Sequence, residues 1–465
     1  MKAQTSSRNE VCIVAALAAY LIARVAPTVD GLTEQGQAVL GVMLTGAILW
    51  VSEATPLGVT ALVVLVLLGL SPGLQLVDAV GGFASDVTFF LLGAAVIGAA
   101  VETSGLAERA ARFLGRAARG SPTRLYAQMI VSLPAFALLV PSAITRNAIL
   151  IPAYRDALDG MGISRSDRAG RALMLALGML NPLASSALLT GGITSITAAT
   201  LLGGFSWLRW FALMAIPYYA LIFVGSVWLR IMVGRFEPGN TGDTAATPPR
   251  PFSAPEIRTL AILALTSVLW LSDSIHRLSP AIPALIAAAV LVFPRIGVMT
   301  WKTAESRLSW GLILTVGTSL SLAGVMTRSG AALWLSDHIV GQLATLTGYP
   351  MILIVGLTVG VALVHLGVTN LAACIALLLP ITASIAQSAG LNPIVCGLVV
   401  TIVVDAVILY PVQTAANLLA YESGYFDSAD VRRLGLGMLV LTTVVVLLVI
   451  PYWAFLGLPW IQPRN

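Results

Sequence analysis

Charged residues are scarce in this chain. Only 10% of its 465 residues are Asp, Glu, Lys or Arg, whereas a soluble domain carries about 25%. Hydrophobic residues make up 58%. This shortage of charge excludes an ordinary soluble domain and predicts a polytopic membrane protein. The net charge of +5 comes mostly from arginines in short loops, which indicates membrane topology and gives no sign of nucleic-acid binding.

Cysteine and histidine are also rare, and this limits the chemistry we expect. Cys12, Cys374 and Cys396 lie in apolar sequence without metal-like spacing, so we expect reduced, buried thiols. The three histidines have no Glu or Cys at the spacing of a zinc site, and a G-x-S-x-G pattern is absent. No cleavable signal peptide is evident. The sequence therefore argues against an enzyme.

Apolar runs follow one another along the whole chain, many of them about 20 residues long and able to cross a bilayer as a helix. Two runs, 126–152 and 345–387, hold internal Gly, Pro and polar residues, and we expect them to form re-entrant helical hairpins. With both hairpins, twenty basic residues lie on the cytoplasmic side together with the N-terminus, and five lie outside. The sequence thus predicts an all-α polytopic membrane protein with about eleven transmembrane helices and two re-entrant helical hairpins.

A polar linker, 236–255, divides the chain into two similar halves. Pro, Gly, Thr and Asp cluster there without an apolar period. The segment E-T-S-G-L-A at 102–107 resembles T-R-S-G-A-A at 327–332, and Thr194 corresponds to Thr414, 220 residues later. An odd number of spans between the copies would give them opposite orientations. An inverted repeat of this kind is typical of alternating-access transporters, whose site lies where the halves meet.

Four polar interruptions of the apolar runs mark the predicted site. They are the hairpin tips, around 141–147 and 365–374, and breaks in two helices, at 190–197 and 411–417. Unwound backbone at a break frees carbonyl groups that can hold Na+, and the amides at a new helix start attract an anion. Any one break could be a packing kink. Four breaks at matching places in two repeats favour a binding site.

Arg146 is the one basic residue that we cannot assign to a loop. A guanidinium at membrane depth costs at least a few kcal/mol unless something pairs with it, so an anionic substrate is its natural partner. Snorkelling, or a structural pair with Asp405, is the alternative. Asp405 itself has four open roles: counter-ion, cation ligand, proton carrier and structural partner. His365 is more often a hydrogen-bonded structural group at such a place than a titrating one.

Several motifs resemble those of the divalent anion:sodium symporters, over nearly the whole chain. Residues 50–62 read W-V-S-E-A-T-P-L-G-V-T-A-L and are similar to the family's W-x-x-E-x-x-P-x-x-x-T-A-L stretch. Residues 409–417 resemble its L-P-x-x-T-P-P-N segment. Pro141, Ser142 and Arg146 look like the P-S-N-T-A-R form of its citrate and dicarboxylate exchangers.

The family's signature motifs are altered here. Ser142-Ala143-Ile144 stands in place of the first S-N-T, and the second reads Thr369-Asn370-Leu371. The two T-P-P-N segments read T-S-I-T at 194–197 and T-A-A-N at 414–417. Because these positions bind substrate and frame the Na+ sites in the family, the changes leave the usual dicarboxylate preference and the sodium coupling open.

The resemblance implies a homodimer in the inner membrane that moves a small divalent, dicarboxylate-like anion together with Na+ by an elevator motion. On this basis we expect scaffold helices in 1–125 and 256–340, transport-domain elements in 126–235 and 341–465, and a cytoplasmic linker at 236–255.

The predicted site residues fall into three groups. The anion is expected at Ser142, Arg146, Thr369, Asn370 and Thr414. Sodium is expected at Ser142, Thr145, Gly191, Gly192, Thr369, Asn370 and Gln413. A proton or counter-ion role is considered for Asp405 and His365. Three alternatives stay open: anion exchange, proton coupling, and an inorganic oxyanion such as sulfate as the substrate.

Overall fold

The computed structural model describes residues 2–52, 54–106, 109, 121–140, 142–237, 251–308, 310–335, 338, 349–367 and 371–461. Within these ranges the chain is helical and contains no strand beyond one isolated bridge, between Leu391 and Ile461. The predicted all-α class is therefore confirmed. Four of the described helices are long and apolar enough to cross a membrane, judged by length and composition: α5 (Asp86–Ser104), α12 (Trp207–Val233), α13 (Ala254–Leu271) and α23 (Ser428–Phe455).

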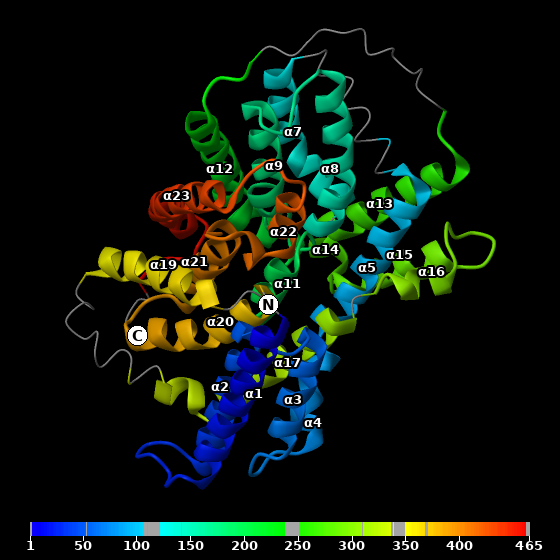
Figure 1. Ribbon diagram of the computed structural model, residues 1–465. Coiled ribbons are helices and arrows are strands. Elements are labelled where there is room, and N and C mark those ends of the chain that lie inside the picture. Colours follow the sequence, from blue (N-terminus) through cyan, green and yellow to red (C-terminus); the bar gives the residue numbers. More distant parts are fainter. Residues whose placement is uncertain are drawn as a thin grey trace.

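In both halves of the chain a pair of helices is followed by a broken helix and then by a long helix: α7 to α12 in the first half and α19 to α23 in the second (Figure 1). Besides α5 and α12, the first half contains α1 (Lys2–Val25), α2 (Glu34–Ser52), α3 (Leu57–Gly69), α4 (Leu76–Val80), η1 (Gly81–Ala84), α7 (Pro122–Leu139), α8 (Ala143–Gly160), α9 (Arg168–Met179), α10 (Asn181–Ser186) and α11 (Ile193–Leu201). Besides α13 and α23, the second half contains α14 (Asp273–His276), α15 (Ala281–Val292), α16 (Trp301–Ser306), α17 (Trp310–Arg328), α19 (Pro350–Gly367), α20 (Leu371–Ser388), α21 (Pro393–Ala406), η3 (Pro411–Gln413) and α22 (Ala415–Tyr421).

The two halves match most clearly where α5 and α17 end. Each helix is followed by a glycine with positive φ, Gly105 at 80° and Gly330 at 75°. Glycine adopts this left-handed conformation at little cost, so it is the usual residue just past a helix end. The serine-glycine pair in each of the two similar segments therefore marks the end of a helix.

Each predicted hairpin region contains a pair of helices. α7 ends at Leu139 and α8 begins at Ala143, where the Ser142 Oγ accepts a hydrogen bond from the Thr145 N–H at 3.2 Å and caps α8. The prediction that this hairpin ends at Pro152 was too short, because α8 continues to Gly160 with Pro152 inside it. In the second half, α19 and α20 flank residues 368–370, which lie outside the described part of the chain.

Each half also contains a broken helix. Residues 187–192 separate α10 from α11, and residues 407–414, which include η3, separate α21 from α22. Both breaks begin a few residues before the predicted ranges. At the first break, a Cβ on Gly191 would lie 1.9 Å from the Ser185 carbonyl oxygen, so only glycine allows the backbone to pass there. α9, which precedes α10, and α21, which leads into the second break, are buried on nearly all faces.

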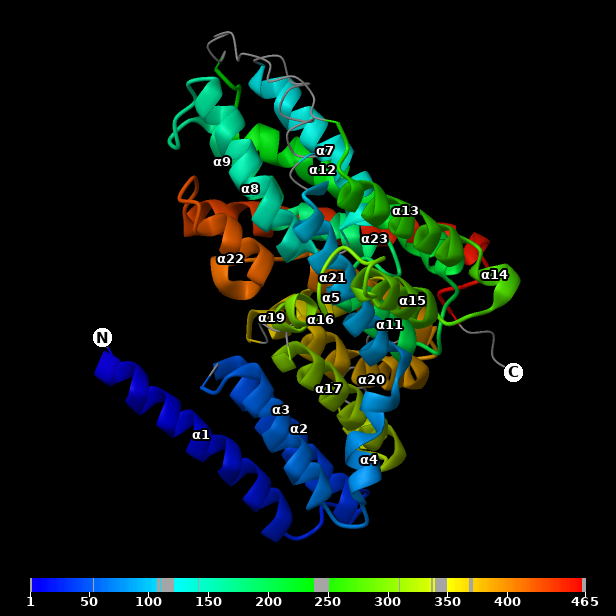
Figure 2. The same cartoon turned by 90° about the vertical axis from the view of Figure 1, so that its right-hand side faces the viewer.

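The halves are interleaved. α22 packs against α8 and α9 of the first half, and α11 packs against α20 and α21 of the second half. α1–α5 pack among themselves and with α13 and α15–α17, whereas α7–α12 pack mainly with α19–α23. Both views place α1–α4 together at one end and α7–α9 with α12 at the other (Figures 1 and 2). The broken helices therefore lie where the two halves meet.

Candidate functional site

Arg146 lies in the first turn of α8 with its side chain fully buried. Its Nε donates to the Asn181 Oδ1 at 2.8 Å, and its Nη1 donates to the Val140 carbonyl at 2.7 Å. Its Nη2 donates to the Asn181 carbonyl at 2.8 Å and to the Ser185 Oγ at 2.6 Å. Arginine stays protonated in proteins, so a positive charge is buried here, and these four acceptors are uncharged.

A chain of amide side chains extends from this guanidinium into the second half. Asn181 donates through its Nδ2 to the Asn147 Oδ1 at 2.7 Å. Asn147 donates through its Nδ2 to the carbonyls of Leu177 and Ala416, both at 2.9 Å. Both asparagines are fully buried. The first hairpin tip is thereby tied to α9, α10 and, through Ala416, to α22.

Asp405 lies near the end of α21 and is only 4% exposed. Its Oδ2 accepts a hydrogen bond from the Tyr218 Oη at 2.6 Å and another from the Thr194 Oγ1 at 3.1 Å. The Ser186 Oγ lies 3.4 Å from the same Thr194 oxygen. Arg146 thus contacts Ser185. The adjacent residue of α10, Ser186, is linked to Asp405 through Thr194.

His365 connects the end of α19 to the second break. Its buried Nδ1 lies 2.9 Å from the Gln413 Nε2. Because an amide NH2 group only donates, this Nδ1 is the acceptor and the ring proton is assigned to Nε2. Gln413 also donates to the Val407 carbonyl at 3.2 Å, and its Oε1 accepts from the Leu409 N–H at 2.7 Å. The His365 Nε2 is buried and has no hydrogen-bond partner among the described residues.

The other predicted site residues are distributed over the same elements. Ser142 and Thr145 share the first turn of α8 with Arg146, and Ser142 is exposed. Gly191 and Gly192 lie in the first break. Thr414 is buried and caps α22, its Oγ1 accepting from the Asn417 N–H at 3.3 Å.

Arg146 thus contacts α10 directly and is linked to α22 through Asn181 and Asn147. Thr194 is hydrogen-bonded to Asp405, and His365 is hydrogen-bonded to Gln413. Thr369 and Asn370 lie outside the described residues.

Sequence reasoning missed several polar groups at these elements. Asn147, Asn181 and Tyr218 are among them, although an asparagine inside an apolar run, as at Asn181 before Pro182, is a usable signal.

The short helices that follow the two breaks each contain a buried side-chain oxygen without a hydrogen-bond partner in the part of the chain that the structure describes: the Thr197 Oγ1 and the Asn417 Oδ1. These residues lie 220 positions apart, at equivalent places in α11 and α22. Unsatisfied buried oxygens suit a hard cation, which takes oxygen ligands.

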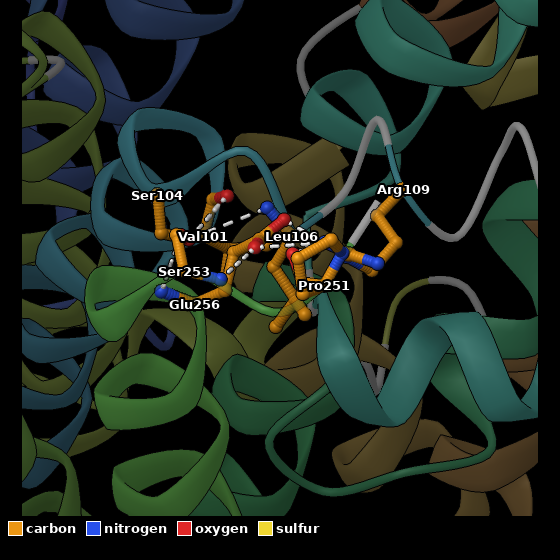
Figure 3. Close-up of polar contacts among 7 residues, drawn as sticks. All are labelled: Val101, Ser104, Leu106, Arg109, Pro251, Ser253 and Glu256. Carbon is orange, nitrogen blue, oxygen red and sulfur yellow. Dashed lines mark hydrogen bonds and ion pairs between the residues drawn. The ribbon is translucent and has the colours of Figure 1, made fainter. Parts of the chain in front are cut away.

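A separate cluster joins the end of α5 to the start of α13 (Figure 3). The Arg109 Nε lies 2.9 Å from the Glu256 Oε1, and its Nη2 donates to the Glu256 Oε2 at 3.0 Å and to the Pro251 carbonyl at 2.8 Å. Glu256 also accepts from the Ser253 N–H at 2.7 Å and so completes a capping box for α13. This ion pair connects the two halves on either side of the predicted linker, away from the candidate site.

Comparison with known proteins agrees with this architecture. The family model described as the sodium:sulfate symporter transmembrane region matches residues 7–459. A membrane protein from Cupriavidus necator is 25% identical over 96% of this chain and 92% of its own length. The sodium-dependent dicarboxylate transporter SdcS from Staphylococcus aureus is 23% identical over 90% of this chain and 86% of its own length.

A similar fold is found among solved structures. The crystal structure of the YdaH transporter from Alcanivorax borkumensis matches with a TM-score of 0.56 and 16% identity, covering 80% of this chain and 87% of that one. At this identity the likeness concerns the fold alone. Because the family model spans nearly all of the sequence, this chain belongs to the sodium:sulfate symporter family, the divalent anion:sodium symporters, and is a membrane transporter and not an enzyme.

Proposed function

We propose that this chain is a secondary active transporter that carries a small divalent, dicarboxylate-like anion across the inner membrane together with Na+. The observation that carries the proposal is the fully buried guanidinium of Arg146, held at a helix-pair tip and linked by Asn181 and Asn147 to the second half. A buried positive charge that lies beside a helix start attracts an anion. The Staphylococcus relative is named for sodium-dependent dicarboxylate transport, which supports this substrate class and this cation.

In this proposal Arg146 attracts the anion mainly through its charge. Four of its hydrogen bonds already go to protein acceptors, so direct hydrogen bonds to the anion come from other groups. The hydroxyl groups of Ser142 and Thr414, which cap α8 and α22, are our candidates, with Thr369 and Asn370 from the second tip. The amides at the start of α8 add favourable partial charge.

Sodium would be held by oxygen atoms around the two breaks. We assign the hydroxyls of Ser142 and Thr145 and the carbonyls of Gly191 and Gly192 to the first half, and Thr369, Asn370 and Gln413 to the second. The unsatisfied oxygens of Thr197 and Asn417 support a cation near the breaks. When bound, Na+ supplies positive charge that offsets the charge of the anion.

An elevator motion is our proposed mechanism of alternating access. The elements that carry the site, in 126–235 and 341–465, pack mainly with one another, and those in 1–125 and 256–340 do likewise, which suits a moving body and a scaffold. We further propose a homodimer with its scaffold at the dimer contact, re-entrant tips, and a cytoplasmic N-terminus.

Binding and transport measurements test the proposal. A ligand that binds only the folded protein raises its apparent stability by mass action, so succinate should raise the thermal unfolding temperature in Na+ more than in choline. Arg146→Ala should lose most of that shift, and Arg146→Lys should keep part of it. Proteoliposomes with an inward Na+ gradient should accumulate labelled succinate. Full stabilisation by succinate in Arg146→Ala would contradict the assignment of Arg146.

Anion exchange or proton coupling, and sulfate as the substrate, are the second candidates. The buried carboxyl of Asp405 beside Thr194 favours the proton alternative. Imposed pH gradients, preloaded anion and competition by unlabelled sulfate separate these possibilities from Na+-coupled dicarboxylate uptake.

A further inference from the structure

Asp405 is a buried acid that the proposed anion and Na+ sites do not use. It comes from the second half, yet its Oδ2 accepts hydrogen bonds from Thr194 in α11 and Tyr218 in α12, which belong to the first half. The carboxyl therefore sits at the junction between the repeats. A charged carboxylate in this environment is supported by neutral hydroxyl groups, which are little compensation for the water it has lost.

The other titratable groups around Asp405 do not neutralise it. Cys374 on α20 is a buried free thiol, and His365 on α19 is hydrogen-bonded to Gln413. On α23, Asp430 pairs with Arg171, Tyr452 donates to the Ala212 carbonyl, and Arg432 and Arg433 are exposed. Arg146 lies beyond α10, where it contacts Ser185. Asp405 thus faces hydroxyl groups, and Arg146 of α8 contacts Ser185, the residue of α10 that precedes Ser186.

The oxygens beside Asp405 suit a proton better than a metal ion. The Ser186 carbonyl accepts hydrogen bonds from the Ser195 Oγ at 3.1 Å and from the Trp210 Nε1 at 3.2 Å. The Ser185 carbonyl accepts from the Leu188 N–H at 2.9 Å. A hard cation needs several oxygens that converge on it with free lone pairs, and these carbonyls are already engaged. A proton needs one carboxyl oxygen.

We infer that Asp405 takes up a proton from water on the side where the anion binds and releases it to water on the other side. In the loaded state an O–H bond forms on the carboxyl, and the group crosses the membrane neutral. This inference rests on the proposed anion transport and adds a proton to the cations that accompany the anion.

The contacts between Arg146, α10 and Asp405 also explain how anion binding is coupled to proton binding. Arg146 contacts Ser185, and Ser186, the next residue, is linked to Asp405 through Thr194. A bound anion offsets the positive charge of Arg146, and this weakens the field that favours the ionised form of Asp405. Anion binding therefore promotes proton uptake, and by linkage a proton on Asp405 strengthens anion binding.

Proton uptake and transport by the full-length protein test the inference, with succinate as the probe. In weakly buffered detergent solution, succinate binding to the wild type should withdraw protons, as reported by a pH-sensitive dye. In proteoliposomes without a Na+ gradient, an inward proton gradient should drive accumulation of labelled succinate. Asp405→Asn should lose both signals at least tenfold, whereas Asp156→Asn, which removes an exposed acid on α8, should keep both.

A second variant covers the case in which Asp405→Asn does not fold. Tyr218→Phe removes a hydrogen bond that favours the ionised carboxylate, so the pH at which succinate withdraws protons should shift upward. An unshifted profile in Tyr218→Phe, or full proton uptake in Asp405→Asn, would overturn the inference. So would a wild type that accumulates succinate with a Na+ gradient but not with a proton gradient. A wild type that shows no counterflow of succinate or sulfate would overturn the proposed transport function as well.

Discussion

Asn181 holds the Arg146 guanidinium through both its side chain and its backbone. Asn181→Leu keeps a similar size but leaves the Arg146 Nε and the Asn147 Oδ1 without a partner. An unsatisfied buried polar group costs about 1–3 kcal/mol, so we expect a lower free energy of unfolding and at least about tenfold weaker succinate binding.

A buried asparagine elsewhere provides the control for this variant. Asn392 donates to the Pro459 carbonyl near the C-terminal end of the described chain. Asn392→Leu should lower the thermal unfolding temperature but leave the succinate Kd of the folded protein unchanged, measured by titration calorimetry. Equal effects of the two substitutions on Kd would show that Asn181 has no special role in positioning Arg146.

Sequence patterns identified Arg146 and Asp405 but not most of their partners. Arg146 stood out because a charge inside an apolar run has few explanations. Tyr218 sits in an apolar helix where a tyrosine has no distinguishing pattern, and its contact with Asp405 joins residues 187 positions apart. Periodicity reports which face of a helix is apolar, and it carries no information on which distant segment lies against that face.

The first helix break depends on Gly191 and much less on its neighbour. A Cβ at Gly191 would lie 1.9 Å from the Ser185 carbonyl oxygen, whereas a Cβ at Gly192 would have nothing closer than 3.7 Å. Gly191→Ala must therefore displace the backbone that carries Ser185, the partner of Arg146. We expect a loss of about 1–3 kcal/mol in the free energy of unfolding and loss of succinate uptake.

Gly192→Ala is the matched control, because Gly192 is in extended conformation and keeps its carbonyl after the substitution. It should retain the unfolding temperature and most of the uptake activity in the same proteoliposome assay. If Gly191→Ala behaves like Gly192→Ala, the close approach to Ser185 does not matter for the break.

The positions of the breaks were foreseeable only in part. Glycine and proline mark the later residues of each break, and the sequence therefore placed both ranges a few residues late. The early residues of the breaks, such as 187–189 and 407–409, are apolar and read as continuing helix. Their conformation is set by contacts with neighbouring elements, which override local preference. The span of the first helix pair was underestimated because a proline was taken as a helix end.

The Arg109–Glu256 ion pair joins the segment after α5, in the middle of the first half, to the start of the second half. A double-mutant cycle with Arg109→Ala, Glu256→Ala and the double variant should give a nonzero interaction energy in thermal unfolding, because the two N–H donors of Arg109 meet both carboxylate oxygens. The control is a cycle on the more exposed pair of Arg307 and Glu102, which should couple less. Similar coupling in both cycles would contradict a special role for the Arg109 contact.

The all-α class and the family could both be predicted from the sequence. Composition alone indicated a membrane protein, and the motifs at 50–62 and 409–417 indicated the family that the comparison confirmed. The scaffold and transport boundaries, the number of spans, the re-entrant tips and the inverted orientation of the repeats stay predictions.

The interleaving of the halves also determines when the protein can finish folding during its synthesis. α8 and α11 emerge from the ribosome early, but their packing partners α22 and α20 begin 255 and 170 residues, respectively, after these helices end. The first half therefore stays in the bilayer without its packing partners from the second half, and the hydrogen-bond network around Arg146 is incomplete during this time. Its amide network closes only when Ala416 has been translated and inserted.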